Sequence, residues 1–375
     1  MPLQKLQFKP GINREGTNYS NEGGWYDCDK VRFRSGNPEK IGGWTQQNTN
    51  QFLGTARSMW AWVDLAGNNY LGVGTNLKYY IQLGSYYDIT PIVTTSTLVN
   101  KCATAFSTLN GTITATATSL VLTSAASFPT TGGIIRIDSE TISYTGVSTN
   151  TLTGLVRGVN GTTAAAHTTG ANVGAYTVTI TDVSYNPYTG DYLTITGGSA
   201  FGGITLSGEY IVTGVPTAST YTITASTFAT SQVSATGGTI VVAYQLPVGT
   251  NIATFGTGWG TGGWSRGSWG SGYSSVLSAQ LRLWSNDNYG QNLFIAPRTG
   301  AVYYWLAASG TGTRAQPLDT LATAAGKDGT YVPNNVLQVL TAPIQQFVIC
   351  MGANPYISGT PNSTFNPLLV PNVAM

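Results

Sequence analysis

The sequence predicts an all-β protein in which a β-propeller-like meander domain, complete or incomplete, is interrupted by two small inserted modules of β-sandwich or barrel type. Three observations lead to this fold class. With 47 Gly, 21 Tyr and abundant Thr among 375 residues, the composition favours strands and tight turns. No stretch shows the pattern of a helix of ordinary length. All nine tryptophans lie outside Val63–Gly258, which indicates an aromatic-rich parent domain split by a Thr/Gly-rich insertion.

The first 50 residues are predicted to be an irregular arm with one short strand. Two Gly-Gly-Trp sequences, ending in Trp25 and Trp44, bracket this strand. Residues 30–34 (KVRFR) alternate apolar and basic side chains with period two, which is typical of a half-exposed strand. Asp27 and Asp29 lie beside these basic residues and indicate local ion pairs.

A three-stranded meander is predicted at residues 57–93, and a second copy follows the insertion at 281–306. Each copy consists of three short apolar runs joined by turn residues. Each also ends in a doubled tyrosine, and we expect all four to pack inside their blades: Tyr79, Tyr80, Tyr303 and Tyr304. Repeated meanders of this size are typical of β-propeller blades.

Residues 1–95 hold the arm and the first propeller-like part, and residues 248–375 continue it, so we expect the two to pack as one domain. A third, partial copy begins at residues 346–351 and runs on to 354–357. A closed propeller needs at least four blades. Either the ring is incomplete in this chain or the propeller interpretation is wrong.

The insertion is predicted to contain two β modules, residues 96–176 and residues 177–247. In the first module, Asn110-Gly111 and Asn160-Gly161 are strong hairpin-turn signals. The second module contains four short strand-like runs. Because insertions are tolerated best at exposed loop tips, we expect the whole block to fold as a peripheral appendage.

Charge is scarce along the whole chain. Only 9% of the residues are charged, against roughly 25% in ordinary soluble domains. The formal net charge of +2 is spread without a basic stripe, so sequence-specific binding to DNA or RNA is not expected. A surface with so few charges favours a protein whose neighbours in an assembly cover much of it.

The cysteines and the apolar segments exclude other classes of protein. Cys28, Cys102 and Cys350 are too few and too scattered for a disulfide framework or a zinc site, so we expect free thiols in a reducing compartment. The N-terminal residues do not show the pattern of a signal peptide. Polar residues and a proline interrupt the apolar stretch at 336–351, so no membrane span and no stable membrane insertion are expected.

The residue types that carry catalysis are sparse. His167 is the single histidine, and we expect it in an exposed loop of small residues. Asp138 and Glu140 lie two apart on an expected strand and so share one face. Paired carboxylates can hydrolyse glycosides, but a solvated strand face is the favoured interpretation. No nucleophile, phosphate-loop or metal motif is present. We therefore expect no enzyme activity, and no catalytic, cofactor-binding or metal-binding residue.

The Gly/Trp stretch at 258–270 is the most unusual segment of the chain. Its three indoles could stack on sugar rings, anchor a neighbouring subunit, or pack against the chain's own domains. Together with the two N-terminal tryptophans they form the set of candidate assembly anchors: Trp25, Trp44, Trp259, Trp264 and Trp269.

Residues 21–36 (NEGGWYDCDKVRFRSG) and 38–44 (PEKIGGW) resemble a family of virion proteins, the tail nozzle or tail tubular proteins of short-tailed (podovirus-type) bacteriophages. Residues 71–75 and the Gly/Trp stretch resemble the same family. The resemblance implies a propeller-based subunit that is made in the bacterial cytoplasm and forms a ring, typically a hexamer, below the portal and adaptor. Implied partners are other copies of the chain, the adaptor or head–tail connector, and tail fibre or tailspike proteins.

The same resemblance implies that genomic DNA passes through the ring without specific binding, and that the family brings no catalytic residues or cofactors. Members of the family continue beyond the equivalent of Met375. Residues 137–144 and 157–163 resemble small β domains that are often inserted into phage structural proteins.

Two functions remain open. One is a structural nozzle that conducts DNA during ejection. The other is host recognition, in which the indole stretch or the inserted modules bind a cell-surface glycan. Enzymatic depolymerisation of a host polysaccharide is a distant third.

Overall fold

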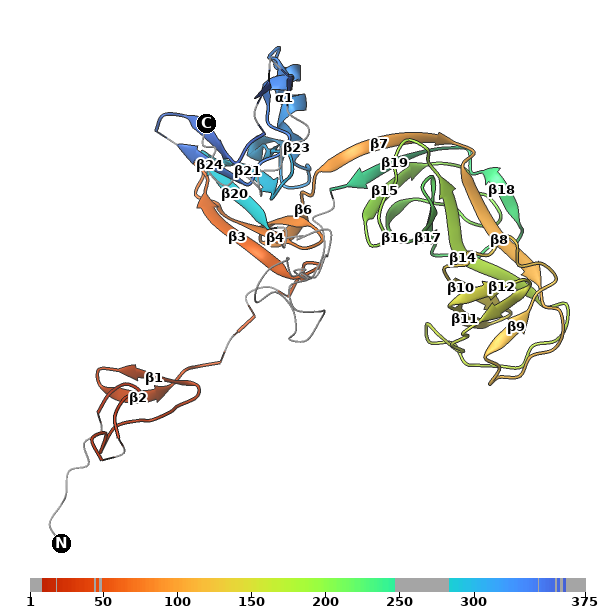
Figure 1. The fold of residues 1–375 in the computed structure, drawn as a ribbon, viewed down its shortest axis with the longest axis horizontal. Helices are drawn as coiled ribbons and strands as arrows, with labels where there is room; N and C mark the ends of the chain where they lie inside the picture. The colour runs from red at the N-terminus through yellow and green to blue at the C-terminus, as the bar shows by residue number, and fades with distance from the viewer. Residues whose placement is uncertain are drawn as a thin grey trace, which may run out of the picture. The chain divides into compact units, whose positions relative to one another are not determined.

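The structure is a computed structural model that describes residues 9–17, 19–43, 45–46, 49–246, 283–342, 344–354, 356–357 and 360–361. The chain is nearly all β, with 47% of the described residues in strands and 4% in helices, and its several sheets include no closed barrel among the described residues (Figure 1). The predicted all-β class is therefore confirmed. The chain divides into two compact units, residues 1–51 and residues 52–375.

The first unit is built around one hairpin. Strands β1 (Val31–Arg34) and β2 (Asn37–Lys40) pair antiparallel, with Val31 opposite Lys40. The two turn residues, Ser35 and Gly36, both have positive φ, which is the backbone geometry of a tight two-residue hairpin turn. The strand expected at 30–34 is present. However, residues 1–51 form a unit of their own and not part of one domain with residues 52–95.

The first meander of the second unit is a four-stranded antiparallel sheet in the order β3-β4-β5-β6. Its strands are β3 (Ala56–Val63), β4 (Asn69–Thr75), β5 (Tyr79–Leu83) and β6 (Ser85–Asp88). Asp64 closes the β3–β4 turn, since its side chain accepts hydrogen bonds from the backbone N–H groups of Ala66 and Asn68. The sequence predicts three of these strands, and β6 is an addition.

The second meander repeats this arrangement in the order β20-β21-β22-β23. Its strands are β20 (Trp284–Tyr289), β21 (Asn292–Pro297), β22 (Tyr303–Trp305) and β23 (Gln316–Pro317). A short 3-10 helix, η1 (Ala307–Ser309), lies between the last two strands, and helix α1 (Leu318–Ala324) and η2 (Gly329–Tyr331) follow them. Of the strand expected at 281–285, Leu281 and Arg282 lie outside the described residues, Leu283 is not in a strand, and β20 begins at Trp284.

One aromatic core joins the two meanders, which is the packing that the repeat predicts. It is formed by twelve buried residues: Trp62, Tyr70, Tyr79, Ile81, Ile89, Leu246, Trp284, Leu293, Ile295, Tyr303, Trp305 and Ala315. Three indole N–H groups bond across the two sheets. Trp60 donates to Asn288 Oδ1 at 3.0 Å, Trp62 to the Gln291 carbonyl at 3.0 Å, and Trp284 to the Thr75 carbonyl at 2.7 Å. Tryptophan thus fixes one sheet against the other.

A smaller core lies on the other face of the second meander. Strands β24 (Gln338–Ala342) and β25 (Phe347–Met351) form a hairpin whose Val339 packs with Phe294, Ala296, Val302 and Val336. Two short strands, β26 (Tyr356–Ile357) and β27 (Thr360–Pro361), pair beyond it. The strands expected at 346–351 and 354–357 are present as β25 and β26, but they do not form the expected copy of the meander, since β25 pairs with β24 and β26 pairs with β27.

The inserted block occupies residues 92–246, and its main sheet has ten strands (Figure 1). The chain enters along β7 (Ile92–Val99) and leaves along β19 (Thr239–Gln245), and these two strands pair antiparallel. The other eight strands are β8 (Cys102–Thr108), β10 (Gly133–Ile137), β11 (Glu140–Tyr144), β14 (Asn172–Thr181), β15 (Tyr192–Gly197), β16 (Gly208–Thr217), β17 (Thr220–Thr224) and β18 (Val233–Thr236). A separate sheet contains β9 (Ser119–Val121), β12 (Gly146–Ser148) and β13 (Thr151–Thr153).

The block contains two cores, but they do not divide at the boundary between residues 176 and 177 that the sequence predicts. Strands β8 and β14 run through both cores. Val173 packs in one core while Val178, on the same strand, packs in the other. Cys102 and Leu98 belong to the second core although they precede the first in sequence. The first module is therefore inserted into the second, a topology that strand-sized sequence patterns do not reveal.

No helix among the described residues has the length and apolar character needed to cross a membrane.

Candidate functional site

The two carboxylates singled out in the sequence do not share a strand face. Asp138 lies in the two-residue turn between β10 and β11, with φ at 50°, and Glu140 is the first residue of β11. The Glu140 side chain is completely buried, whereas that of Asp138 is 63% exposed. The interpretation as a solvated strand face is thus wrong for Glu140, because the turn at Asp138 shifts the two residues out of the strand alternation.

Glu140 is surrounded by hydrogen-bond donors. Arg157 donates to both carboxylate oxygens, from Nε to Oε1 at 2.8 Å and from Nη2 to Oε2 at 2.7 Å. The backbone N–H groups of Gly158 and Ala165 donate at 3.0 Å each, and His167 Nε2 lies 2.8 Å from Oε2. Burial alone would raise the pKa of Glu140, but the hydrogen bonds from Arg157, Ala165 and His167 outweigh it and hold the pKa at about 2.

His167 lies in the same cluster and is 4% exposed, so the expectation of an exposed loop residue is wrong. Its Nδ1 lies 2.8 Å from Asp138 Oδ2 while its Nε2 faces Glu140. Both ring nitrogens can donate to carboxylates only when the imidazole is protonated. Backbone bonds with Ile113 hold the loop in place.

This cluster acts as a structural clamp, which is formed by Glu140, Arg157, His167 and Asp138. The lone pairs of Glu140 are occupied by protein donors, which leaves this carboxylate no room to act on a substrate. It instead ties the loop at residues 156–167 to the β10–β11 hairpin. One signal in the sequence could have indicated this. Residues 96–260 carry only three basic and five acidic residues, so each buried charge there needs a partner close by.

A second charge cluster, which sequence reasoning missed, links the meanders to the inserted block. Lys78 is 4% exposed at its side chain and lies 2.8 Å from Asp88 Oδ2 and 2.6 Å from Glu209 Oε2. Arg314 lies 3.2 Å from Asp88 Oδ2. Burial would raise the pKa of Asp88, and the charges of Arg314 and Lys78 outweigh burial and lower it. Gln245 Nε2 also donates to Glu209 at 2.6 Å.

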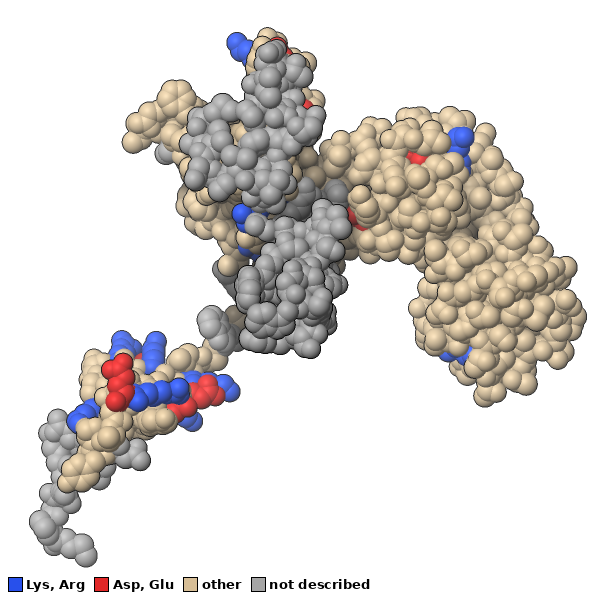
Figure 2. Space-filling view, viewed as in Figure 1, with Lys and Arg blue, Asp and Glu red and all other residues tan. Residues whose placement is uncertain are grey.

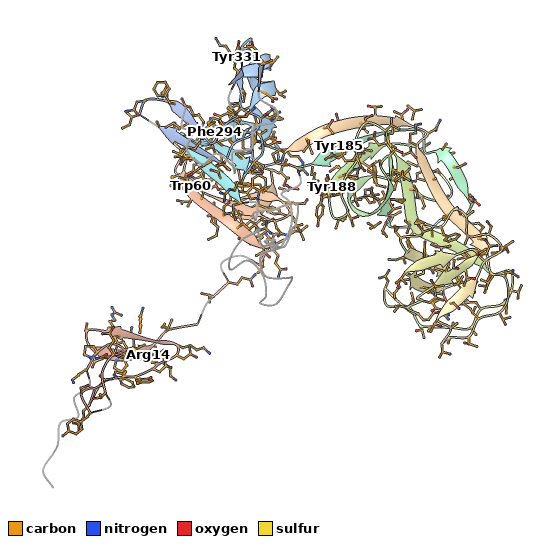
Figure 3. All side chains as sticks on the ribbon, in the orientation of Figure 1. Arg14, Trp60, Tyr185, Tyr188, Phe294 and Tyr331 are labelled. Atoms are coloured by element: carbon orange, nitrogen blue, oxygen red, sulfur yellow. The ribbon has the colours of Figure 1, made fainter. Side chains whose placement is uncertain are left out.

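A cavity of about 350 Å³ lies on the second meander, between the outer face of its sheet and α1. Tyr289, Phe294 and Tyr304 form its aromatic side, and Phe294 is labelled in Figure 3. Tyr304 is therefore half-buried at this cavity, whereas Tyr79 and Tyr303 lie in the shared core as expected. Tyr80 is also buried, against Phe52.

Of the five candidate anchors, the structure describes one. Trp25 is half-buried in the first unit, with its ring 6.2 Å from that of Phe33 in an edge-on contact. Trp44, Trp259, Trp264 and Trp269 lie outside the described residues. In the same unit Asp29 lies 3.9 Å from Lys30, as expected, while Asp27 pairs with Arg14 at 2.8 Å.

The surface of the second unit is poor in charge. Figure 2 shows Lys, Arg, Asp and Glu gathered on the first unit and almost absent from the visible described surface elsewhere. Large apolar side chains are exposed on the first meander and on the β24–β25 hairpin. On β3 and its turn these are Met59, Val63 and Leu65, with exposed fractions of 66%, 56% and 97%. On the β24–β25 hairpin they include Phe347 at 65% and Ile349 at 42%.

No family model and no curated protein sequence matches the chain. Among solved structures, the chain is similar to a phage phi92 endosialidase, with 15% sequence identity and a TM-score of 0.17. The alignment covers 72% of this chain and 40% of that one, so the chain spans less than half the length of that protein.

Proposed function

We propose that the chain is a structural subunit of a phage tail, which assembles with copies of itself into a ring and serves as the nozzle through which DNA leaves. The observation that carries this proposal is the exposed apolar surface on the first meander and on the β24–β25 hairpin, within a chain that has few charges. Residues 21–44 support it through their resemblance to tail nozzle proteins. The adaptor and the tail fibre proteins are the proposed neighbours.

The apolar surface favours association with other chains. Exposed apolar side chains scattered singly are ordinary, but contiguous apolar patches mark interfaces. On β25, Phe347, Ile349 and Met351 alternate along one face of the strand, and all three are exposed. Their cross-strand neighbours on β24 include Leu340 and Ala342. This face is an apolar strip without a charged residue.

The location of the two apolar surfaces suits a ring. One lies on β3, in the first meander, and the other lies on β25, beyond the second. Contact between two different surfaces of identical subunits is head-to-tail, and such contacts close into rings when the rotation permits. A near-neutral chain also suits a DNA channel, because many phosphate contacts would retain the genome.

The proposal is tested by measuring the mass of the purified chain and of two variants. Phe347→Asp combined with Ile349→Asp places two charges on the apolar strip. The matched control is Val183→Asp, on an 83% exposed residue of the inserted block. We expect rings for the unaltered chain and the control, and monomers for the double variant, with unchanged circular dichroism in all three. Rings formed equally well by the folded double variant would contradict this role of the strip.

A further inference from the structure

The cavity on the second meander has the size and composition of a ligand site. Its volume of about 350 Å³ lies at the lower end of the range of roughly 300–1,000 Å³ for small-molecule sites. Aromatic rings from β20, β21 and β22 form one side, and Leu318, Leu321 and Ala322 face them. Leu306, which is 44% exposed, lies at its rim.

The aromatic side is held rigidly. The Tyr304 hydroxyl accepts a hydrogen bond from Asn292 Nδ2 at 2.6 Å, and the Tyr289 hydroxyl donates to the Gln346 carbonyl at 3.3 Å. The rings of Phe294 and Tyr304 lie 4.6 Å apart, centroid to centroid. Because these rings are already fixed, a ligand that stacks on them loses little free energy to ordering the protein.

Polar groups sit beside the rings. Arg314, Gln316, Ser309 and Thr313 line the cavity. The guanidinium of Arg314 is fixed by its bonds to Asp88 and to the Thr90 carbonyl, the latter at 2.8 Å. Its positive charge is balanced by Asp88, which disfavours an acidic ligand. The hydroxyl and amide groups can exchange hydrogen bonds with a neutral polar ligand.

We propose that this cavity binds a neutral saccharide, of one or two pyranose rings. A pyranose has an apolar C–H face, which suits the rings of Tyr289 and Tyr304, and hydroxyl groups at its edge, which suit Gln316 and Thr313. This binding site goes beyond the structural role proposed above. It also assigns the saccharide to the second meander, whereas the sequence pointed to the indole stretch or the inserted modules.

The test uses two substitutions on one helix. Ala322 lines the cavity, so Ala322→Phe fills it without removing a hydrogen bond, whereas Ala324 is exposed and does not line it. The full chain and both variants are titrated with glucose, galactose, mannose, N-acetylglucosamine and their neutral disaccharides, with saturation-transfer NMR as the readout. We expect at least one sugar to bind the full chain and Ala324→Phe equally, and to bind Ala322→Phe at least ten-fold more weakly.

Three outcomes would overturn the inference. One is that no sugar of the panel binds up to about 10 mM, a concentration that would reveal millimolar affinity. The second is that Ala322→Phe binds as tightly as Ala324→Phe. The third is that an apolar probe such as anilinonaphthalene sulfonate binds in the cavity while no sugar does, which would mark it as a docking site for apolar side chains. Mass measurement on the same samples tests ring assembly independently, so the two proposals can fail separately.

Discussion

The indole of Trp284, in the second meander, packs directly against Gly74, in the first meander. A Cβ atom on Gly74 would lie 2.4 Å from Cδ1 of the Trp284 indole, so the ring occupies the space that any other residue would fill. The indole then reaches the backbone and donates to the Thr75 carbonyl at 2.7 Å. Glycine in the interior of β4 therefore has a packing reason and is not a sign of a weak strand.

We expect Gly74→Ala to lower the free energy of unfolding by about 1–3 kcal/mol, the usual cost of forcing extra atoms into a packed core. The substitution displaces the indole and weakens its hydrogen bond. Chemical denaturation followed by tryptophan fluorescence measures the effect. Gly312→Ala is the control, because a Cβ there meets no atom within 4 Å, and it should change stability by less than about 0.5 kcal/mol. Equal losses in the free energy of unfolding from both variants would contradict the tight packing of Trp284 against Gly74.

The pairing of Trp284 with Gly74 also shows what the sequence can and cannot reveal. The two meanders are visible in sequence because strand alternation and turn residues are local. Their common core follows from the repeat and from the clustering of tryptophan. Which indole meets which glycine depends on how two sheets pack, and no local pattern encodes this.

Removing the buried carboxylate of the clamp should lower the free energy of unfolding substantially. Glu140→Gln leaves the guanidinium of Arg157, 8% exposed, without its counter-charge, and we expect stability to fall by about 3–5 kcal/mol. Asp138→Asn removes the other carboxylate that contacts His167, but Asp138 is largely exposed, and the cost should stay below about 1 kcal/mol. Thermal unfolding of both variants gives the comparison. A loss for Asp138→Asn as large as that for Glu140→Gln would show that the clamp does not depend on burial.

The lowered pKa of Glu140 also predicts that the folded chain loses stability in acid. The pKa of Glu140 is about 2 in the folded chain against 4.5 for an ordinary glutamate, so the unfolded chain binds its proton first as the pH falls. The stabilising contribution of Glu140 is therefore complete above pH 4.5 and is lost progressively between pH 4.5 and pH 2. Melting temperatures measured across this window should fall more steeply for the unaltered chain than for Glu140→Gln. Parallel curves for the two proteins would be inconsistent with the depressed pKa.

The charge cluster at Lys78 offers a further test. Lys78→Met removes a buried ammonium group that lies between Asp88 and Glu209, and leaves Arg314 as the remaining basic partner of these two carboxylates. We expect a loss of about 1–3 kcal/mol, since the two carboxylates then share one positive charge and are only partly exposed to water. Lys101→Met, at an exposed residue of the inserted block, should change stability by less than about 0.5 kcal/mol. If Lys78→Met is as stable as its control, the cluster does not hold the chain together.

Sequence patterns reveal least about contacts between segments that are far apart in the chain. The clamp joins Glu140 to residues 17 to 27 positions away, and the Lys78 cluster spans more than two hundred positions to Arg314. Sequence spacing indicates which residues lie on one face of a strand or helix. The residues of these two clusters come from separate elements, and only the topology of the chain brings them together. The sequence does show that charged residues are scarce in the Thr/Gly-rich block. This scarcity is the sign in the sequence that each of these charges has a partner.

The central claim, that the chain is a ring-forming nozzle subunit of a phage tail, is tested most directly by a cryo-EM map of the virion that carries it. We expect several copies arranged in a ring around the tail axis, below the adaptor, with the exposed apolar surfaces on β3 and β25 of neighbouring copies at the subunit contacts. A map that places the chain in a peripheral fibre, away from the path of the DNA, would contradict it.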